Sequence, residues 1–287
     1  MKKIITILIV ILLISSNLIG ANAATSDILM DEENGYTYKV LSDGTLEITE
    51  YSGTATEITL PEEFNGYKVT SVGGFAFSKN NTIENLIIPA SIEAIGFRAF
   101  EHLECLKTVE IFGDKSWIEN NEINPYNGNR AFSGCANLTS VILHDGISIL
   151  GNKSFYWCES LKEIHIPVTV GEIKNESIGY NKFTSGNTPN VSKDITFKIY
   201  GYENSIAEVY ANKNDMVFVS TGNLIEDYML DVNYDNNINA EDALLVLKHA
   251  AKISELDYNQ NMISDANDDD TINASDALEI LKQAAGL

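Results

Sequence analysis

A 23-residue internal repeat constrains the fold of this 287-residue chain more than any other feature of its sequence. The segment ENLIIPASIEAIGFRAFEHLECLKTVEIF aligns with NLTSVILHDGISILGNKSFYWCESLKEIHIP so that the apolar positions coincide. One aromatic position recurs at Phe77 and Phe100, and again with the same spacing at Phe132 and Phe155. A fixed period of about 20 to 50 residues is typical of a solenoid, in which stacked units share one core.

Each repeat unit predicts a short strand and a second apolar wall. Alternating apolar positions, the period of a strand, occur at 86–88, 109–111, 141–143 and 164–166. Pro89 and Pro167 follow two of these segments, and proline cannot extend a strand ladder. The opposite wall is predicted from the pairs Ile92 and Ile95, Ile147 and Leu150, and Val170 and Ile173. One unit alone has no interior, so we expect stacking to bury these side chains and the repeated phenylalanines.

Different sequences flank and interrupt the repeats. Residues 24–54 alternate around Asp43-Gly44, which predicts a β-hairpin that caps the array. The segment ITFKIYGYENSIAEVYANKNDMVFVS predicts a strand, a helix and a final strand that close the other end. The step from Phe100 to Phe132 is longer than one repeat by nine residues, which are inserted within GDKSWIENNEINPYNGN. Its Trp117 and Tyr126 are candidate ligand-binding residues that could stack on a sugar, or they could pack over the solenoid flank.

The N-terminus has the pattern of an export signal. MKK precedes the apolar run IITILIVILLISSNLIG, and Ala21-Asn22-Ala23 provides an A-x-A exit. Ser15, Ser16 and Asn17 interrupt the run, which disfavours a permanent membrane anchor. We therefore predict cleavage after Ala23, a secreted protein and no membrane span in the mature chain.

The mature chain is strongly acidic. Cleavage removes Lys2 and Lys3 and no acidic residue, so 17 basic side chains face 41 acidic ones and the net charge is −24. A field of this sign repels phosphate backbones and attracts divalent cations. We therefore exclude nucleic acid as a partner.

Three cysteines are too few, and odd in number, for a disulfide framework in a secreted protein. The repeat register places Cys135 and Cys158 inside the solenoid as small hydrophobic residues, while Cys105 is given no role. Whether Cys135 and Cys158 stay reduced is left open.

Two twelve-residue loops near the C-terminus carry the most specific pattern in the chain. DVNYDNNINAED begins at Asp231, and DANDDDTINASD begins at Asp265. Calcium takes about six to eight oxygens, which such a loop supplies from positions 1, 3, 5, 7 (a carbonyl), 9 (through water in the case of Asn239) and 12. The predicted ligands are Asp231, Asn233, Asp235, Asn237, Asn239 and Asp242, then Asp265, Asn267, Asp269, Thr271, Asn273 and Asp276. Two Ca²⁺ ions are therefore expected as cofactors.

The residues around the ligands support these loops. Position 6 usually carries glycine, but Asn236 and Asp270 stand there, and these two types tolerate a left-handed backbone. Ile238 and Ile272 at position 8 are expected to anchor the loops to a common core. Each loop runs into an amphipathic helix, and no good helix is predicted before either loop. The apolar stripe consists of Leu244, Leu247 and Ala251 in one helix, and of Leu278, Leu281 and Ala285 in the other.

Two parts of the chain resemble known families. Roughly residues 55 to 219 resemble the BspA-like leucine-rich repeats of bacterial surface proteins, whose pattern IPxxVxxIGxxAFxxCxxLxxVxIP appears as HDGISILGNKSFYWCESLKEIHIP. The duplicated loop with an exiting helix resembles a type I dockerin over residues 224–287. The resemblance implies a mainly β leucine-rich-repeat solenoid plus a small all-α calcium-binding dockerin. The expected boundaries are 1–23 for the signal peptide, 24–54 for the β cap, 55–222 for the solenoid and 223–287 for the dockerin.

The dockerin resemblance implies a partner, the cohesin module of a scaffoldin in a cellulosome of ruminal or gut clostridial bacteria. It also implies recognition through loop positions 10 and 11 and the following helix. These residues are Ala240, Glu241, Leu247, Lys248 and Lys252 in one half, and Ala274, Ser275, Leu281, Lys282 and Gly286 in the other. Three of the five pairs match, so a cohesin could accept the module in one orientation or in two.

Three functions are considered. We favour a secreted, non-catalytic cellulosome component whose solenoid binds a protein or a glycan. The alternatives are a cell-surface adhesin and a dockerin-borne carbohydrate-active enzyme with an unrecognised site. Glycoside hydrolysis needs two carboxylates in a cleft, whereas acidic residues of the repeats fall singly on predicted turns. The four histidines neighbour no nucleophile motif, and neither GxSxG nor HExxH occurs, so we expect no enzymatic activity.

Overall fold

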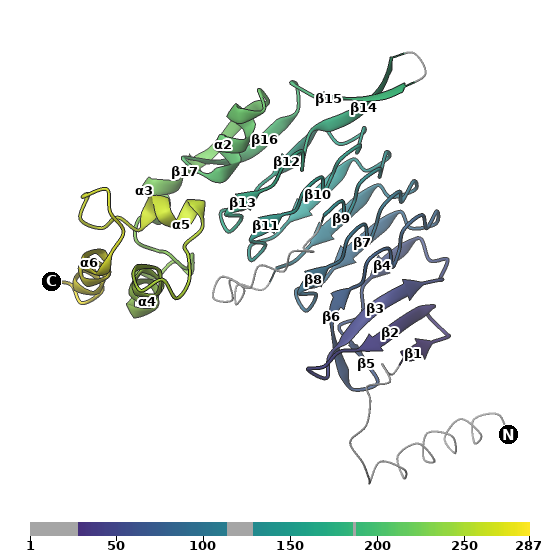
Figure 1. The fold of residues 1–287 in the computed structure, drawn as a ribbon, viewed down its shortest axis with the longest axis horizontal. Helices are drawn as coiled ribbons and strands as arrows, with labels where there is room; N and C mark the ends of the chain where they lie inside the picture. The colour runs from purple at the N-terminus through teal and green to yellow at the C-terminus, as the bar shows by residue number, and fades with distance from the viewer. Residues whose placement is uncertain (1–27, 114–128, 186–187) are drawn as a thin grey trace, which may run out of the picture.

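The computed structural model describes residues 28–113, 129–185 and 188–287. Stacked strands form a solenoid, and a small helical module follows at its C-terminal end (Figure 1). The expected signal peptide and the candidate ligand residues Trp117 and Tyr126 lie outside the described residues. Within the described ranges, no helix is long and apolar enough to cross a membrane.

An antiparallel hairpin begins the fold, which confirms the predicted turn. Asp43 Oδ1 accepts hydrogen bonds from the Thr45 N–H at 2.9 Å and the Thr45 hydroxyl at 2.8 Å, and Gly44 has a φ of 85°. The third strand then pairs in parallel with β6, which joins the hairpin to the repeats. The strands of this end are β1 (Ile28–Asp31), β2 (Tyr36–Val40), β3 (Leu46–Tyr51), β5 (Glu63–Phe64) and β6 (Tyr67–Val72).

The repeats build two parallel walls. Equivalent strands of successive units pair in parallel, as Leu86 does with Val109 and Val109 with Val141, and the described ladder of the first wall is interrupted only between the strands at 140–143 and 163–165. The first wall contains β4 (Glu57–Thr59), β7 (Asn85–Ile88), β9 (Thr108–Ile111), β10 (Ser140–Leu143), β12 (Glu163–His165), β16 (Lys198–Glu203) and β17 (Val217–Asn223). The second wall contains β8 (Ala94–Ile95), β11 (Ile149–Leu150) and β13 (Glu172–Ile173). The strands and the register predicted from the repeat are confirmed.

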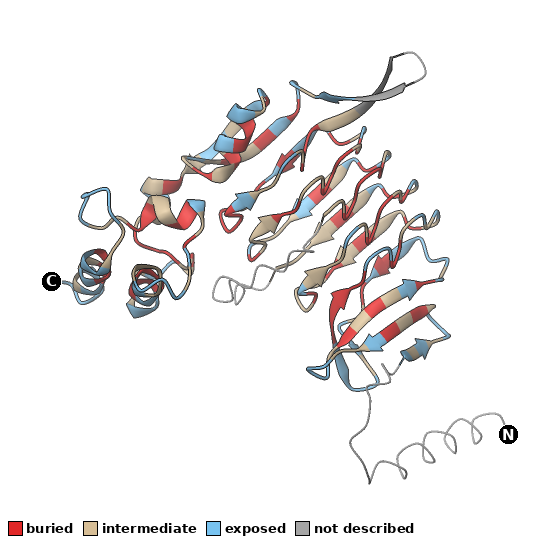
Figure 2. Cartoon of the chain, in the orientation of Figure 1, coloured by how far each residue is buried: buried red, intermediate tan, exposed pale blue. Residues whose placement is uncertain are grey.

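A column of phenylalanine rings fills the space between the walls. The rings of Phe77, Phe100, Phe132 and Phe155 follow one another with centroids 4.9, 5.0 and 5.4 Å apart. Each of these side chains is at most 2% exposed, and buried residues recur in every turn of the solenoid (Figure 2). The inward orientation of the repeated phenylalanines is therefore confirmed.

Two cysteines line the same interior, as predicted. Cys135 donates its thiol to the carbonyl of Phe100 at 3.3 Å, and Cys158 donates to the carbonyl of Phe132 at 3.2 Å. Burial raises the pKa of the Cys135 thiol to about 12 and that of Cys158 well above its ordinary value. A neutral buried thiol is a poor nucleophile, so both act as packing groups.

The C-terminal end of the solenoid closes with the predicted strand, helix and strand, in which α2 (Ile206–Lys213) connects β16 to β17. An additional antiparallel hairpin, β14 (Tyr180–Ser185) and β15 (Thr188–Lys193), was not predicted. The helical module that follows consists of α3 (Leu224–Tyr228), α4 (Ala240–Ala250), α5 (Tyr258–Ile263) and α6 (Ala274–Ala284).

A short helix precedes each loop, where the sequence predicts no good helix. The short α3 leads into the first loop, and the short α5 leads into the second. Asn223 caps α3, and Asp257 with Gln260 forms a capping box on α5. Helices this short cannot display an apolar repeat of 3.6 residues, so their caps are the only sequence signal they leave.

Truncation of Phe132 to Ala tests the column. We expect the free energy of unfolding to fall by about 3 to 5 kcal/mol, because the cavity cannot collapse between stacked rings. Chemical denaturation followed by circular dichroism measures this loss. Phe75→Ala is the matched control, since its ring is 51% exposed, and we expect about 1 kcal/mol or less. Equal losses for the two variants would contradict the assigned register.

Candidate functional site

The first loop wraps its backbone around the carboxylate of Asp231. Asp231 Oδ1 accepts a hydrogen bond from the Asp235 N–H at 3.0 Å, and Oδ2 accepts one from the Asn236 N–H at 2.9 Å. Asp242 reaches back from the last position, where its Oδ1 accepts from the Asn233 N–H at 3.1 Å. Backbone N–H groups of the loop therefore hold both the first and the last predicted ligand.

The second loop repeats this arrangement. Asp265 accepts from the N–H groups of Asp269 at 3.2 Å and Asp270 at 2.9 Å. Asp276 takes the place of Asp242 and accepts from the Asn273 N–H at 2.8 Å, as Asp242 accepts from the Asn239 N–H at 2.8 Å. Two segments with the same hydrogen bonds at the same positions share one backbone geometry.

Left-handed residues make both loops turn. Asn236 and Asp270, which replace the usual glycine, have φ values of 65° and 61°, as their residue types allow. Ile238 and Ile272 pack against one cluster of buried residues from α4 and α6, which confirms the anchoring predicted for position 8.

The acidic groups of the first loop favour a cation. Burial raises the pKa of the Asp242 carboxyl above its ordinary value, and the nearby charges of Asp231 and Asp235 raise it further. In the described part of the chain no Lys or Arg forms an ion pair with Asp235 or Asp242. A bound divalent ion would relieve this crowding of like charges.

The donor set is mixed rather than purely acidic. Among the described residues, no three His, Cys, Asp or Glu side chains form a metal-sized group by themselves. The loops reach six or more oxygens only by adding Asn side chains and backbone carbonyls, which are hard donors that suit calcium better than zinc or copper. The residues present therefore fit a calcium ion.

Two of the predicted ligands have a second role in the structure. The side-chain oxygens of Asn239 and Asn273 cap α4 and α6, accepting from the N–H groups of Glu241 at 2.7 Å and Ser275 at 2.8 Å. Their amides donate to the carbonyls of the residues at position 7. A direct metal bond from either side-chain oxygen would compete with the helix cap.

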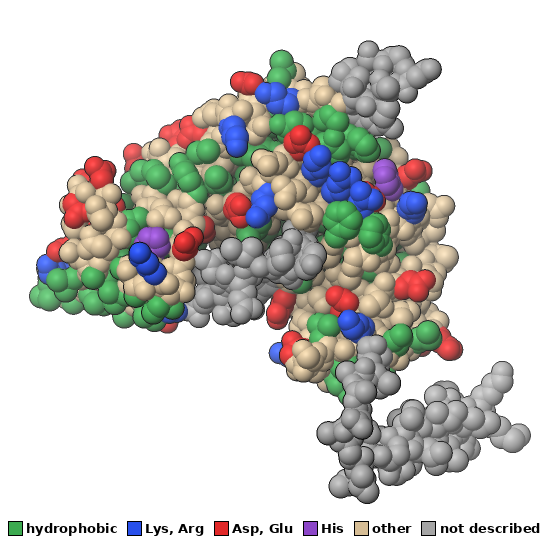
Figure 3. All heavy atoms as spheres, viewed as in Figure 1, with side chains coloured by type: hydrophobic (Ala, Val, Ile, Leu, Met, Phe, Trp, Pro, Cys, Tyr) green, Lys and Arg blue, Asp and Glu red, His purple; other side chains and the backbone are tan. Residues whose placement is uncertain are grey.

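One face of the helical module exposes apolar side chains in pairs. The exposed fractions are 47% for Leu244 and 52% for Leu278, 39% for Leu247 and for Leu281, and 75% for Ile253 and 92% for Leu287. The two residues of each pair are separated along the chain by the same number of residues as the starts of the two loops. Figure 3 shows hydrophobic side chains gathered along the edge of the module that carries α4 and α6.

The structure places the predicted cohesin-contacting residues around this stripe. Ala240, Glu241, Ala274 and Ser275 are exposed at the first turns of α4 and α6. Lys252 and Gly286 are exposed just beyond the two helices, and Lys248 and Lys282 are partly exposed within them. Sequence reasoning assigned Leu244 and Leu278 to the apolar stripe of the two helices but not to the cohesin surface. It did not single out Ile253 and Leu287, although the offset between the two loops also relates these two positions.

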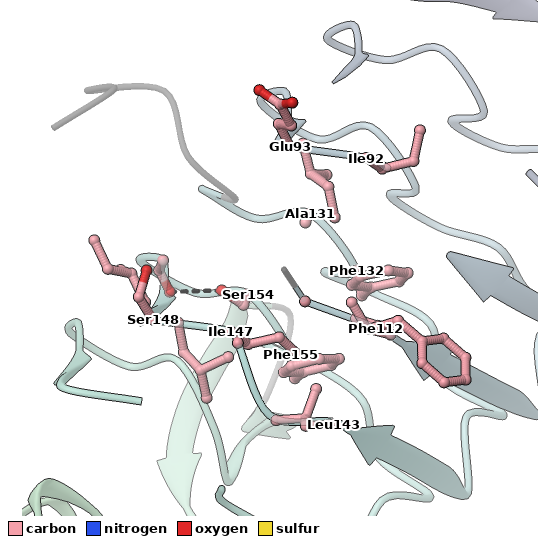
Figure 4. Close-up of a pocket in the computed structure, with 17 residues that line it drawn as sticks. Ile92, Glu93, Phe112, Ala131, Phe132, Leu143, Ile147, Ser148, Ser154 and Phe155 are labelled. Carbon is pink, nitrogen blue, oxygen red and sulfur yellow. Dashed lines mark hydrogen bonds between the residues drawn. The ribbon is translucent and has the colours of Figure 1, made fainter. Parts of the chain in front are cut away.

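A separate pocket of about 110 Å³ opens in the solenoid (Figure 4). Its mostly apolar lining includes Ile92, Ile95, Phe132, Leu143, Ile147 and Phe155. β8 pairs with β6 and β11 pairs with β13, and no described strand joins β8 to β11. One repeat after Ile95 is position 118, which lies outside the described residues. The pocket is therefore core surface at a gap in the described second wall.

Comparison with known families matches both parts of the chain. The BspA type leucine rich repeat region matches in six copies over residues 47–124 and 125–238. The type I dockerin domain matches residues 229–284. The two matches overlap at 229–238, but the parallel strands end with β17, so the first calcium loop lies with the helical module. Both matched modules are non-catalytic, and type I dockerins bind calcium.

Solved structures with a similar fold are bacterial leucine-rich repeat proteins. The T. pallidum leucine-rich repeat protein is 19% identical, with 68% of this chain and 86% of that chain covered and a TM-score of 0.47. A leucine-rich repeat protein from Bacteroides capillosus is 24% identical, with coverages of 52% and 88% and a TM-score of 0.34. The pneumococcal vaccine antigen PcpA is 16% identical, with coverages of 55% and 53% and a TM-score of 0.34. No curated protein matches.

Calcium removal tests the loops. In the full chain, we expect EDTA to speed hydrogen exchange of the α4 and α6 amides strongly, because the loops that position these helices lose the charge that balances their carboxylates. The amides of β7 and β9 serve as an internal control and are expected to stay protected. Identical exchange of α4 and α6 in calcium and in EDTA would contradict the calcium assignment.

Proposed function

This chain belongs to the BspA-type leucine-rich-repeat family and carries a type I dockerin domain, and from this combination we propose that it is a secreted, non-catalytic cellulosome component. The dockerin binds a cohesin module of a scaffoldin in a calcium-dependent way. The solenoid holds a protein or glycan ligand for the complex. The mature chain begins at Ala24, with the solenoid at 55–222 and the dockerin at 223–287.

The observation that carries the cohesin proposal is the paired apolar stripe of α4 and α6. Large apolar side chains in a contiguous exposed patch mark an interaction surface. Here Leu244, Leu247 and Ile253 have equivalents in the other half, with matching exposure for the leucines. A protein partner would cover this stripe, with exposed Ala240 and Ala274 leaving room for close approach.

Two Ca²⁺ ions complete the proposal. The twelve loop residues predicted from the sequence hold them, with Asp231, Asp235 and Asp242 supplying carboxylates in the first loop and Asp265, Asp269 and Asp276 in the second. The bound ion supplies positive charge that lets these groups stay ionised while close together. The capping roles of Asn239 and Asn273 favour an indirect contact at position 9.

The outer face of the first wall offers a surface for the solenoid's ligand. Phe112 stacks on His144 with centroids 4.0 Å apart, and His165 stacks on Tyr200 at 4.3 Å. The Nε2 atom of His144 lies 2.7 Å from Glu110 Oε1. Rings that are at least partly exposed beside a carboxylate suit a glycan or a peptide, because both present polar groups next to apolar surface.

The ligand assay separates the three functions. The mature chain is tested for binding to plant cell-wall glycans, to peptides and to intact cells, and for release of sugars from polysaccharides. Binding to glycans or peptides supports a cellulosome role, and binding to cells without cohesin binding supports an adhesin. Sugar release that survives purification would overturn the non-catalytic assignment.

The symmetry of the stripe predicts how cohesin binding responds to mutation. We expect Ala240→Arg or Ala274→Arg alone to weaken binding less than about fivefold, because the other half still fits the partner. The double variant is expected to lose more than about 100-fold, measured by calorimetry in calcium. If one single variant abolishes binding, only that face is recognised. If the double variant binds normally, the recognition surface lies elsewhere.

A further inference from the structure

One side chain of the helical module is built into the end of the solenoid. Asn259 of α5 is 1% exposed, and its amide donates to the carbonyls of Val168 at 2.8 Å and Val170 at 2.9 Å. Its side-chain oxygen accepts from the N–H of Ile206, the first residue of α2, at 2.7 Å. Both the amide nitrogen and the oxygen of this side chain therefore form hydrogen bonds with the solenoid.

Asn259 occupies a position at which the next repeat unit would contact the solenoid. One repeat earlier, the carbonyl of Ile147 accepts a hydrogen bond from the buried hydroxyl of Thr169, which belongs to the following unit. The carbonyl of Val170 lies one repeat further along the chain and is equivalent to that of Ile147, but it receives Asn259 instead. The module thus supplies the hydrogen bond that a further unit would have supplied.

The first calcium loop contributes directly to the same contact. Tyr234, at loop position 4, is 2% exposed and clusters with Val168 of the solenoid. Its ring meets the edge of Tyr228 at 5.6 Å, and Tyr228 meets Tyr202 of β16 at 5.4 Å, both at 81°. An unbroken row of rings therefore runs from the solenoid wall to the loop.

Hydrogen bonds also tie α5 to the first loop. Gln260 Nε2 donates to the Val232 carbonyl at 3.0 Å, and the Leu230 N–H donates to the Ile263 carbonyl at 3.0 Å. Val232 and Leu230 lie on either side of Asp231, the first predicted ligand. The position of α5, and with it that of Asn259, is therefore fixed to the geometry of this loop, and α5 lies beside α3, which leads into the loop (Figure 1).

The second loop has no comparable attachment among the described residues. Its position 4 is Asp268, which is exposed where Tyr234 is buried, although both residues are left-handed, with φ values of 61° and 58°. The side-chain hydrogen bonds of the loop stay within residues 265–276. The second loop is thus attached to the described solenoid only through α5, which leads into it, whereas the first loop also places a side chain of its own, Tyr234, in the contact.

We propose that calcium binding by the first loop and docking of the dockerin on the solenoid are one coupled equilibrium. The docked solenoid holds Tyr234 and α5 in the arrangement that the first loop needs, so it raises the calcium affinity of the first loop more than that of the second. By linkage, a filled first loop holds the dockerin against the solenoid to the same degree. This inference rests on the proposed calcium sites.

Calcium titration of each loop in the full mature chain tests the coupling. Asp265→Ala with Asp269→Ala leaves only the first loop, and Asp231→Ala with Asp235→Ala leaves only the second. We expect Asn259→Ala to weaken calcium binding by about tenfold or more in the first background and by less than about twofold in the second.

A second variant changes the contact from the solenoid side. A Cβ atom on Gly171 would clash with the side chain of Asp257, which caps α5. We expect Gly171→Ala to weaken calcium binding by the first loop as Asn259→Ala does, although it alters no residue of the dockerin. Asn261→Ala is the matched control, since this α5 amide donates only within the dockerin, to the carbonyls of Leu256 and Asp257.

Hydrogen exchange of the Ile206 amide gives an independent measurement. In the wild-type chain we expect this amide to exchange about tenfold faster in EDTA than in calcium, and in Asn259→Ala to exchange fast in both. Unchanged first-loop affinity in both contact variants, with calcium-independent exchange at Ile206, would overturn the coupling. Failure of either wild-type loop to bind calcium would instead overturn the proposed function.

Discussion

The stacking of each repeat unit on the next is the constraint on which the rest of the structure depends. The unit turns through left-handed residues at Phe75, Arg98 and Lys153, with φ values of 62°, 57° and 57°, and such a backbone costs roughly 1 to 2 kcal/mol for each non-glycine residue. The neighbouring unit offsets this cost. The Phe77 N–H donates to the Ala99 carbonyl at 2.8 Å, and the phenylalanine rings stack above the same turn. A unit without a neighbour loses both contributions, so the ends of the array decide whether it is stable.

The two ends meet this requirement differently. The N-terminal hairpin adds strands to β6 and covers the first ring of the column with Tyr51, whose centroid lies 5.1 Å from that of Phe77. At the other end, β16, α2 and β17 close the first wall, but the second wall still presents the carbonyls of Val168 and Val170. Asn259 satisfies both of them. The dockerin is therefore part of the solenoid's cap as well as a separate binding module.

The repeat and the loops could be predicted from the sequence because their signals recur at fixed spacings along the chain. The column of Phe100, Phe132 and Phe155 and the anchoring of Ile238 follow from such periodicity. The role of Asn259 could not be predicted in this way, since it occurs once and its acceptors, Val168 and Val170, are distant in sequence. The one available signal was a break in symmetry, because Tyr234 occupies a position where the second loop has an aspartate.

This break in symmetry gives the dockerin two unlike faces. Leu247 and Leu281 are equally exposed in the two halves, so a partner that met the halves in exchanged positions would find a similar apolar stripe. The solenoid contact uses Tyr234 and Asn259 and has no equivalent in the second half. If a partner accepts the stripe in two orientations, these would therefore carry the solenoid in two different directions. Because buried hydrogen bonds rather than a flexible linker join the modules, those directions would be distinct, and each would point the outer face of the repeats toward a different side of the complex.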